Sequence, residues 1–240
     1  YPEFIYEQTK DQLRVVIGGS HGKTSITSMI LHVLSKNNID HNYMVGAQLD
    51  GFECMVKLSK TSKIAVLEGD EYLSSPIDRR PKFHLYHPNI AVISGIAWDH
   101  INVFPTFENY VEQFKIFIEK VENSGVVVYY NGDKELTQLI NKVDSPIAKI
   151  PYEAYPHYIK DGITYLKTNE GHKPIKIFGE HNLQNLNAAY NVCVELGVTS
   201  SDFFDAIATF KGASKRLELV KMYETTAVYK DFAHSPSKLK

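Results

Sequence analysis

The sequence lacks the features that mark secreted and membrane proteins. Its two cysteines, Cys54 and Cys193, lie far apart and outside any C-x-x-C spacing, which leaves no metal–thiolate site and is typical of a reducing compartment. No apolar run approaches the ~18 residues of a membrane-spanning helix. The N-terminal stretch YPEFIYEQTK lacks the basic-then-apolar order of a signal peptide. We therefore expect a soluble protein of the cytoplasm.

An excess of charge of one sign is also missing. The 240 residues contain 26 Lys and Arg against 28 Asp and Glu, a formal net charge of -2. Such a chain offers no broad positive field to a nucleic acid backbone or an anionic membrane, so we expect neither as a partner. Its length is sufficient for a buried core without disulfide cross-links. The sequence leaves the oligomeric state open.

Short apolar runs alternate with longer amphipathic ones along the chain. The short runs are rich in Val and Ile, as expected for strands covered on both faces, and lie at Leu13–Ile17, Ile64–Leu67, Ile90–Ser94 and Val126–Tyr130. We therefore predict an α/β fold with a mostly parallel sheet flanked by helices. Three helices are expected between and after the strands: one carrying Ile26, Met29, Ile30, Val33 and Leu34, one after Pro105 carrying Phe107, Tyr110, Val111, Phe114 and Ile118, and one from about His181.

Two later segments predict antiparallel pairs. Asp161-Gly162 stands between alternating runs in YIKDGITYL, which is a strong hairpin signal and predicts a small antiparallel sheet. The segment LELVKMYETTAVYKDF has the pattern strand, turn, strand. Gly and Ser in FKGASKR favour a boundary around Lys211–Val220. The last twenty or so residues then read as the start of a further unit.

The stretch VVIGGSHGKTSITSMIL has the composition of a phosphate-binding loop between a strand and a helix. Gly19 and Gly22 would let the backbone curl around an anion, Lys23 would neutralise outer phosphates, and the Thr24 hydroxyl would ligate Mg²⁺. The spacing departs from G-x-x-x-x-G-K-[ST], because Ile17 stands five residues before Gly22. The alternative is a glycine-rich turn with a solvated lysine.

Polar residues follow two of the predicted strands. Glu68 ends one run and is followed by Asp70 and Glu71, and Asp99 and His100 come a few residues after another. Ligands of open parallel sheets bind beyond the carboxyl ends of the strands, so Glu68 could hold Mg²⁺ beside the loop and His100 a second metal ion or a phosphate. Taken singly, such carboxylates are commonly solvated or cap a helix, and a lone histidine is usually part of the packing.

Six segments, in order, resemble the motifs of the Mur ligases, ATP-dependent amide-forming enzymes of peptidoglycan synthesis. They are GGSHGKTS, EGDEY, DHINVF, FGEHNLQNLNAA, FKGASKRLE and YKDFAHSPSKL. The chain departs from the family pattern at Lys215 and Ser235, whereas Arg216 and His234 match it. Within the family, DEYLSSPIDRRPKFHLYHPNIAVI is closer to the murein-peptide-recycling ligases than to the L-alanine-adding ligases.

The resemblance implies one part of a three-domain enzyme. Residues 1–12 would be a linker from an N-terminal UDP-sugar domain, residues 13–215 the central ATP-binding domain, and residues 216–240 the start of a C-terminal domain that brings the amine. The implied reaction joins L-alanine or a murein peptide to UDP-N-acetylmuramate through an acyl phosphate, with ATP and Mg²⁺ as cofactors.

The resemblance also assigns roles by motif match. Lys23, His100 and Arg216 would be catalytic, and Thr24, Glu68 and His100 would ligate Mg²⁺. His181 and Asn185 would contact the adenine and Asp231 the ribose. The loop that holds the phosphates would comprise Gly19, Ser20, His21, Gly22, Lys23, Thr24 and Ser25. Without the family match, Asn185 would cap a helix or face solvent, His181 would close a helix, and Arg216 would pair with Glu218. A modified lysine of some family members aligns with Phe114, not with Lys115.

Three other readings stay open at this point. The chain could belong to another enzyme of the superfamily, such as a folylpolyglutamate or cyanophycin synthetase. It could be an ATP-binding module without ligase turnover, at least in this form. A P-loop kinase or switch GTPase is the third, although its expected N-K-x-D segment or lid is not convincingly present.

Overall fold

A seven-stranded sheet forms the centre of the molecule. The computed structural model describes residues 1–47, 52, 54–98, 101–213 and 218–231. Within them the strand order is β3-β2-β4-β1-β5-β6-β7, and every neighbouring pair is parallel except β2 with β3. The strands are β1 (Leu13–Gly18), β2 (Asn42–Met44), β3 (Val56–Lys57), β4 (Ile64–Glu68), β5 (Ile90–Ile93), β6 (Val126–Tyr130) and β7 (Ala148–Tyr152). The predicted α/β fold with a mostly parallel sheet is confirmed.

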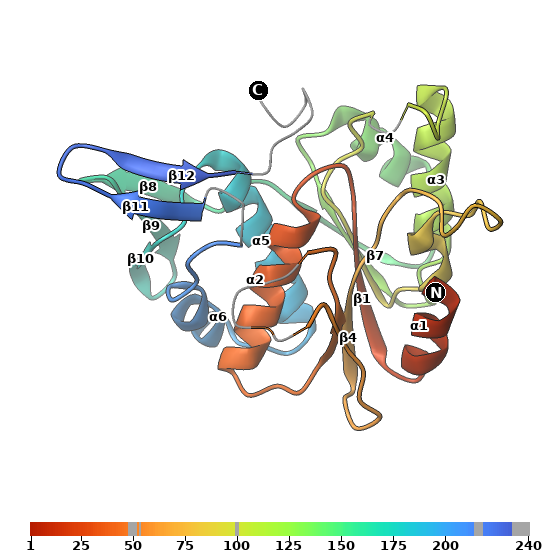
Figure 1. The fold of residues 1–240 in the computed structure, drawn as a ribbon, viewed down its shortest axis with the longest axis horizontal. Helices are drawn as coiled ribbons and strands as arrows, with labels where there is room; N and C mark the ends of the chain where they lie inside the picture. Colours follow the sequence, from red (N-terminus) through yellow and green to blue (C-terminus); the bar gives the residue numbers. More distant parts are fainter. Residues whose placement is uncertain (48–51, 53, 99–100, 214–217, 232–240) are drawn as a thin grey trace.

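Helices cover both faces of this sheet (Figure 1). One layer contains α2 (Lys23–Lys36), α5 (Glu180–Glu195) and α6 (Ser200–Ile207), and the other contains α1 (Pro2–Thr9), the 3₁₀ helix η1 (Lys82–Leu85), α3 (Phe107–Glu119) and α4 (Lys134–Lys142). Because strand side chains alternate, Val15 and Ile17 of β1 join the first core and Val16 the second. This explains why the strands read as continuous apolar runs.

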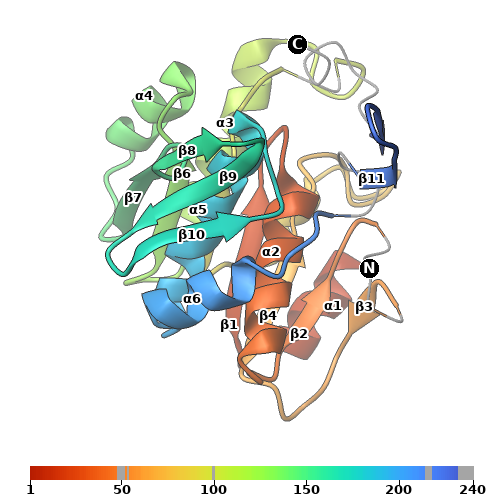
Figure 2. The ribbon, with the colours of Figure 1, turned by 90° about the vertical axis from the view of Figure 1, so that its left-hand side faces the viewer.

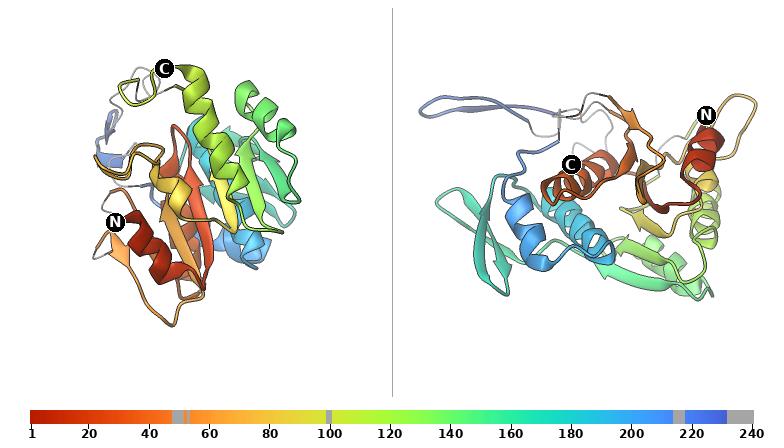
Figure 3. Two further views of the ribbon diagram at one scale, coloured as in Figure 1. Left: turned by 90° about the vertical axis from the view of Figure 1, so that its right-hand side faces the viewer. Right: turned by 90° about the horizontal axis from the view of Figure 1, so that it is seen from below.

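Both predicted hairpins are present. Strands β8 (His157–Lys160), β9 (Ile163–Thr168) and β10 (Gly171–Ile175) form a small antiparallel sheet beside α6, where Lys173 of β10 pairs with Asp205 (Figure 2). Asp161 and Gly162 have φ of 52° and 76°, the positive values that a tight hairpin turn requires. Strands β11 (Glu218–Met222) and β12 (Ala227–Lys230) form a second hairpin that projects from the body (Figure 3).

The segment predicted as a linker, residues 1–12, contains helix α1. Ile5 is buried in the second core, and the Arg14 guanidinium donates through Nη1 to the carbonyl oxygens of Thr9, Lys10 and Gln12 at 3.2, 2.6 and 2.9 Å. A buried arginine on β1 thus satisfies carbonyl groups at the end of the helix and in the turn that follows it. The proposed domain boundaries themselves remain predictions. No described helix has the length and apolarity needed to cross a bilayer.

The topology brings three loops to one edge of the sheet. Strand β1 lies between β4 and β5, and all three run parallel. The segments that follow Gly18, Glu68 and Ile93 therefore leave the sheet side by side. This is the edge at which ligands of open α/β sheets bind.

The buried His84 of η1 makes stability depend on pH. Its Nε2 lies 2.7 Å from the Gln113 carbonyl of α3, and burial, outweighing that bond, lowers the pKa of His84 to about 4. An unfolded histidine titrates near ~6.5, so the unfolded state binds the proton first and wild-type stability should fall as pH drops from ~6.5 to 4. Chemical unfolding of wild type and His84→Gln at pH 7, 5.5 and 4 should show their difference in unfolding free energy shrinking. A difference that is constant with pH would contradict this.

Candidate functional site: a phosphate loop at the carboxyl edge of the sheet

The loop after β1 has the backbone that an anion cradle needs. Gly19 and Gly22 have φ of 120° and 79°, and Lys23 then starts α2. A Cβ on Gly19 would collide with Ser94, whose amide nitrogen would be 2.6 Å away. The Ser94 hydroxyl in turn donates to the His21 carbonyl. Glycine is therefore required at position 19 both for its dihedral angle and for the close approach.

The segment after β5 holds the loop in place from one side. The Ser20 amide donates to the Gly95 carbonyl at 3.0 Å, and its hydroxyl donates to the Ala97 carbonyl at 2.7 Å. The Ser20 hydroxyl also lies 3.0 Å from the Tyr110 hydroxyl of α3. Asp133, the N-cap of α4, accepts from the Ile96 amide at 2.8 Å. The cradle is thus fixed before any ligand arrives.

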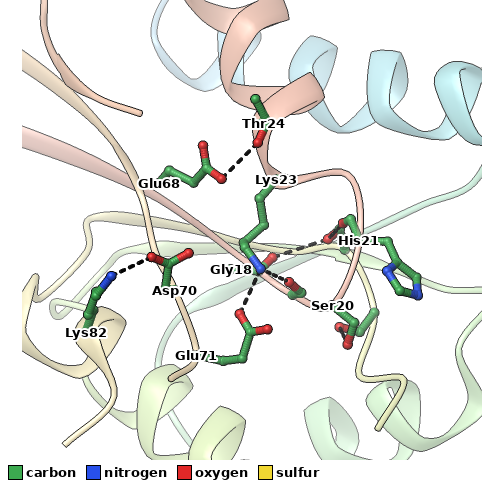
Figure 4. A network of polar contacts seen from close by, with 12 residues as sticks. Gly18, Ser20, His21, Lys23, Thr24, Glu68, Asp70, Glu71 and Lys82 are labelled. Atoms are coloured by element: carbon green, nitrogen blue, oxygen red, sulfur yellow. Dashed lines mark hydrogen bonds and ion pairs between the residues drawn. The ribbon is translucent and has the colours of Figure 1, made fainter. Parts of the chain in front are cut away.

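Lys23 crosses the mouth of the loop. Its Nζ donates to the Gly19 carbonyl at 2.7 Å and to Glu71 Oε2 at 2.7 Å (Figure 4). The side chains of Lys23 and Glu71 are 13% and 1% exposed. Burial alone would lower the pKa of the Lys23 ammonium, but the attraction of Glu71 and of two neighbouring carboxylates raises it above its ordinary value. The lysine is therefore cationic at neutral pH.

Thr24 and Glu68 form an oxygen pair beside the lysine. Thr24 Oγ1 donates to Glu68 Oε1 at 2.9 Å, and the Gly46 amide donates to Glu68 Oε2 at 2.9 Å. Burial raises the pKa of the Glu68 carboxyl, an effect that the Gly46 amide and Lys23 partly offset. A hydroxyl and a carboxylate are ligands that suit Mg²⁺. No cluster of three or more His, Cys, Asp or Glu occurs among the described residues, which do not include His100.

Asn185 reaches the loop from α5. A Cβ on Gly22 would collide with the Asn185 carboxamide, whose Cγ would be 3.1 Å away. Gln184 beside it lines a cavity of about 440 Å³ together with Tyr130, Glu153, Tyr155 and Glu180, among others. The Gln184 amide donates to the Tyr130 hydroxyl at 3.1 Å. A larger cavity of about 640 Å³ lies at the opposite edge, where β1, β5 and β6 begin, away from this chemistry.

The remaining predicted residues are less closely grouped. His181 is exposed in the first turn of α5, where Nδ1 lies 3.3 Å from Gln184 Oε1. Ser25 is buried in the first turn of α2, and the imidazole of His21 lies on the far side of the loop from Glu68 (Figure 4). Asp231 is exposed directly after β12. The roles given to these residues remain predictions.

Two central predictions fall outside the described residues. His100 and Arg216, predicted as a metal ligand and a phosphate contact, lie in the ranges 99–100 and 214–217. Two neighbouring residues of α3 bear on the modified lysine of some family members. Phe114, which aligns with that lysine, is fully buried. Lys115 is 44% exposed and pairs with Glu112 at 3.3 Å.

Sequence reasoning gave no role to several residues that contact the loop. Glu71 pairs with Lys23, Ser94 bonds the loop backbone, and Tyr110 meets Ser20. Of these three residues, only Glu71 could have been proposed from the sequence, because it follows the same strand as Glu68. The positions of Ser94 and Tyr110 depend on how β5 and α3 pack, which periodicity does not reveal.

Comparison with known proteins agrees with this geometry. Residues 17–193 match the family described as the Mur ligase middle domain. The chain belongs to the Mur ligase family. It is similar to a protein of Caldicellulosiruptor bescii named UDP-N-acetylmuramate–L-alanine ligase, with 33% identity over 99% of this chain and 53% of that protein. This Mur ligase chain thus spans about half the length of the curated relative.

Two solved structures share the fold. The UDP-N-acetylmuramate:L-alanyl-gamma-D-glutamyl-meso-diaminopimelate ligase of Neisseria meningitides has a TM-score of 0.77 and 23% identity, covering 88% of this chain and 70% of that one. A point mutant of L. casei FPGS has a TM-score of 0.73 and 12% identity, covering 99% and 72%. Identities this low relate the folds and leave the substrate open.

We predict that Lys23→Ala weakens ATP binding at least tenfold, because it removes a charge-assisted phosphate contact of ~1.5–3 kcal/mol. Isothermal titration calorimetry measures the effect, and Lys36→Ala at the exposed far end of the same helix is the control. Circular dichroism should show an unchanged fold in both. An ATP affinity unchanged in Lys23→Ala would count against a phosphate site here.

Proposed function

We propose that this chain is the nucleotide-binding middle domain of an ATP-dependent ligase that joins an amino acid or a murein peptide to UDP-N-acetylmuramate. One observation supports this most directly: Lys23, the pair Thr24–Glu68 and Asn185 converge on one glycine loop although they come from three different elements. The names of the relatives support the ligase class and the peptidoglycan substrate.

The proposed reaction turns a carboxylate into a good electrophile. The γ-phosphoryl group of ATP passes to the carboxylate of UDP-N-acetylmuramate, the amine attacks the resulting acyl phosphate, and phosphate leaves. Phosphoryl transfer needs positioning and charge neutralisation more than covalent help from the protein. The fixed loop, with Lys23 at its mouth, is suited to both.

Each residue has a defined part in this proposal. The amides of the loop and Lys23 bind the β- and γ-phosphates, while Asn185 faces the nucleotide from α5. Thr24 and Glu68 would hold Mg²⁺, which when bound neutralises phosphate charge. His100 and Arg216 keep their predicted roles as a ligand of a second Mg²⁺ and a γ-phosphate contact. We add the cavity lined by Tyr130 and Gln184 as the place for the adenine.

The amine is the open part of the proposal. The relative with 33% identity is named for L-alanine, whereas the segment from Asp70 to Ile93 favours the murein-peptide branch. A phosphate-release assay on the full-length protein, with UDP-N-acetylmuramate and either L-alanine or the tripeptide L-alanyl-γ-D-glutamyl-meso-diaminopimelate, tests both. Turnover with one amine identifies the branch.

Two alternatives are outcomes of the same assay. Turnover with a folate and glutamate, but with neither muramate substrate, would favour a folylpolyglutamate synthetase, whose fold class the comparison also supports. ATP binding without turnover by the full-length protein would favour a binding module. Absence of ATP binding would contradict the proposed function altogether.

The magnesium site gives a separate prediction. Thr24→Val and Glu68→Gln each remove an oxygen ligand or its charge, so the Mg²⁺ concentration that half-saturates ATP binding should rise roughly tenfold. Thr24→Ser keeps the hydroxyl and should stay within about threefold of wild type. Titration of Mg²⁺ at fixed ATP, followed by the fluorescence of Trp98, the single tryptophan, provides the measurement. Equal behaviour of the valine and serine variants would refute the ligand role of Thr24.

A further inference from the structure

The cation of the phosphate loop is already neutralised by a buried carboxylate. Lys23 Nζ and Glu71 Oε2 are 2.7 Å apart, and the Glu71 side chain is 1% exposed. The neighbouring carboxylate, Asp70, forms its ion pair with Lys82 at 2.8 Å, whereas Glu71 forms the ion pair with Lys23 (Figure 4). The carboxylate therefore offsets much of the attraction that the ammonium would otherwise exert on an anion.

This pairing opposes the binding of an anion. A triphosphate must approach the ammonium that Glu71 holds, and it meets at short range the charge of a carboxylate that is only 1% exposed. Repulsion between like charges is strong where screening is weak. Removal of the Glu71 charge should therefore strengthen ATP binding, whereas loss of an ordinary structural contact would weaken it.

The same contact orients the lysine. Two of the three ammonium donors are engaged, one by the Gly19 carbonyl and one by Glu71, so the chain of Lys23 lies across the loop in a fixed direction. Within the described part of the chain the third donor has no acceptor and is left for a phosphate oxygen. Glu71 thus fixes the position of Lys23 and at the same time limits its attraction for phosphate.

We propose that Glu71 is a positioning residue for Lys23 that holds the ammonium in the nucleotide-free protein and competes with the phosphates of ATP for it. The inference rests on the proposed function, because it takes the loop to be the ATP site. As a consequence, the protein should bind ATP more weakly than the same loop would without the charge of Glu71. Weaker ground-state binding of nucleotide leaves more of the lysine's attraction for the transition state.

Glu71→Gln separates charge from position. Glutamine has nearly the size of glutamate, and its carbonyl oxygen still accepts a bond from Lys23. We expect the Kd for Mg-ATP of this 240-residue chain, measured by calorimetry, to fall roughly three- to tenfold. The matched control is Asp78→Asn, which removes the same charge from the same loop where the carboxylate pairs with Arg80 instead. Its Kd should stay within about twofold of wild type.

A second measurement covers the case in which Glu71→Gln folds poorly. Glu71→Gln should lower the melting temperature by roughly 3 °C less in the Lys23→Met background than in the wild-type background, because the ammonium that Glu71 holds is then already absent. An equal effect of Glu71→Gln in both backgrounds would overturn the proposed competition, because Glu71 would then not hold the ammonium of Lys23.

The outcomes distinguish this inference from the proposed function. Wild type that binds ATP, together with Glu71→Gln that binds it equally or more weakly, would overturn the inference and leave the function standing. Wild type that does not bind ATP would overturn both. Equal tightening in Glu71→Gln and Asp78→Asn would show a general charge effect and would also overturn the specific role of Glu71.

Discussion

The close approach of Gly19 to Ser94 is the constraint on which the rest of this edge depends. It requires a residue without Cβ, and it ties the loop after β1 to the segment after β5. Ser20 repeats the tie through the carbonyl oxygens of Gly95 and Ala97. Because the two loops are joined, the start of α2 is fixed relative to the sheet. The positions of Lys23 and Thr24 in its first turn are fixed with it. The site is therefore rigid on one side because backbone groups, not long side chains, fix it.

The other side of the site consists of buried charge. Glu68 and Glu71 come from a single segment after β4, yet one meets a hydroxyl and an amide and the other meets an ammonium. Burial of such groups costs free energy unless each has a partner, and Thr24, the Gly46 amide and Lys23 are such partners here.

Sequence patterns were sufficient to predict the elements that depend on local sequence. Val- and Ile-rich runs predicted β1, β4, β5 and β6 within a residue or so, because strands buried on both faces need continuous apolar residues. The glycines and Lys23 predicted the loop for an equally local reason. The helix α1 was missed because what holds it is Arg14 and the core contact of Ile5, neither of which is visible in a pattern of eight residues.

The same distinction applies to the site. Thr24 and Glu68 were predicted to lie together because each stands at the end of its own element, and the parallel sheet does bring these two side chains within 2.9 Å. Asn185 was predicted by motif alone, and its nearness to Gly22 comes from the packing of α5 against α2 across the first core. Whether Glu68 or Glu71 meets Lys23 depends on three residues of loop after β4, too few for periodicity to orient. The sequence therefore indicates which acidic segment faces the phosphate loop. The folded structure is needed to show that Glu68 contacts the threonine and Glu71 the lysine.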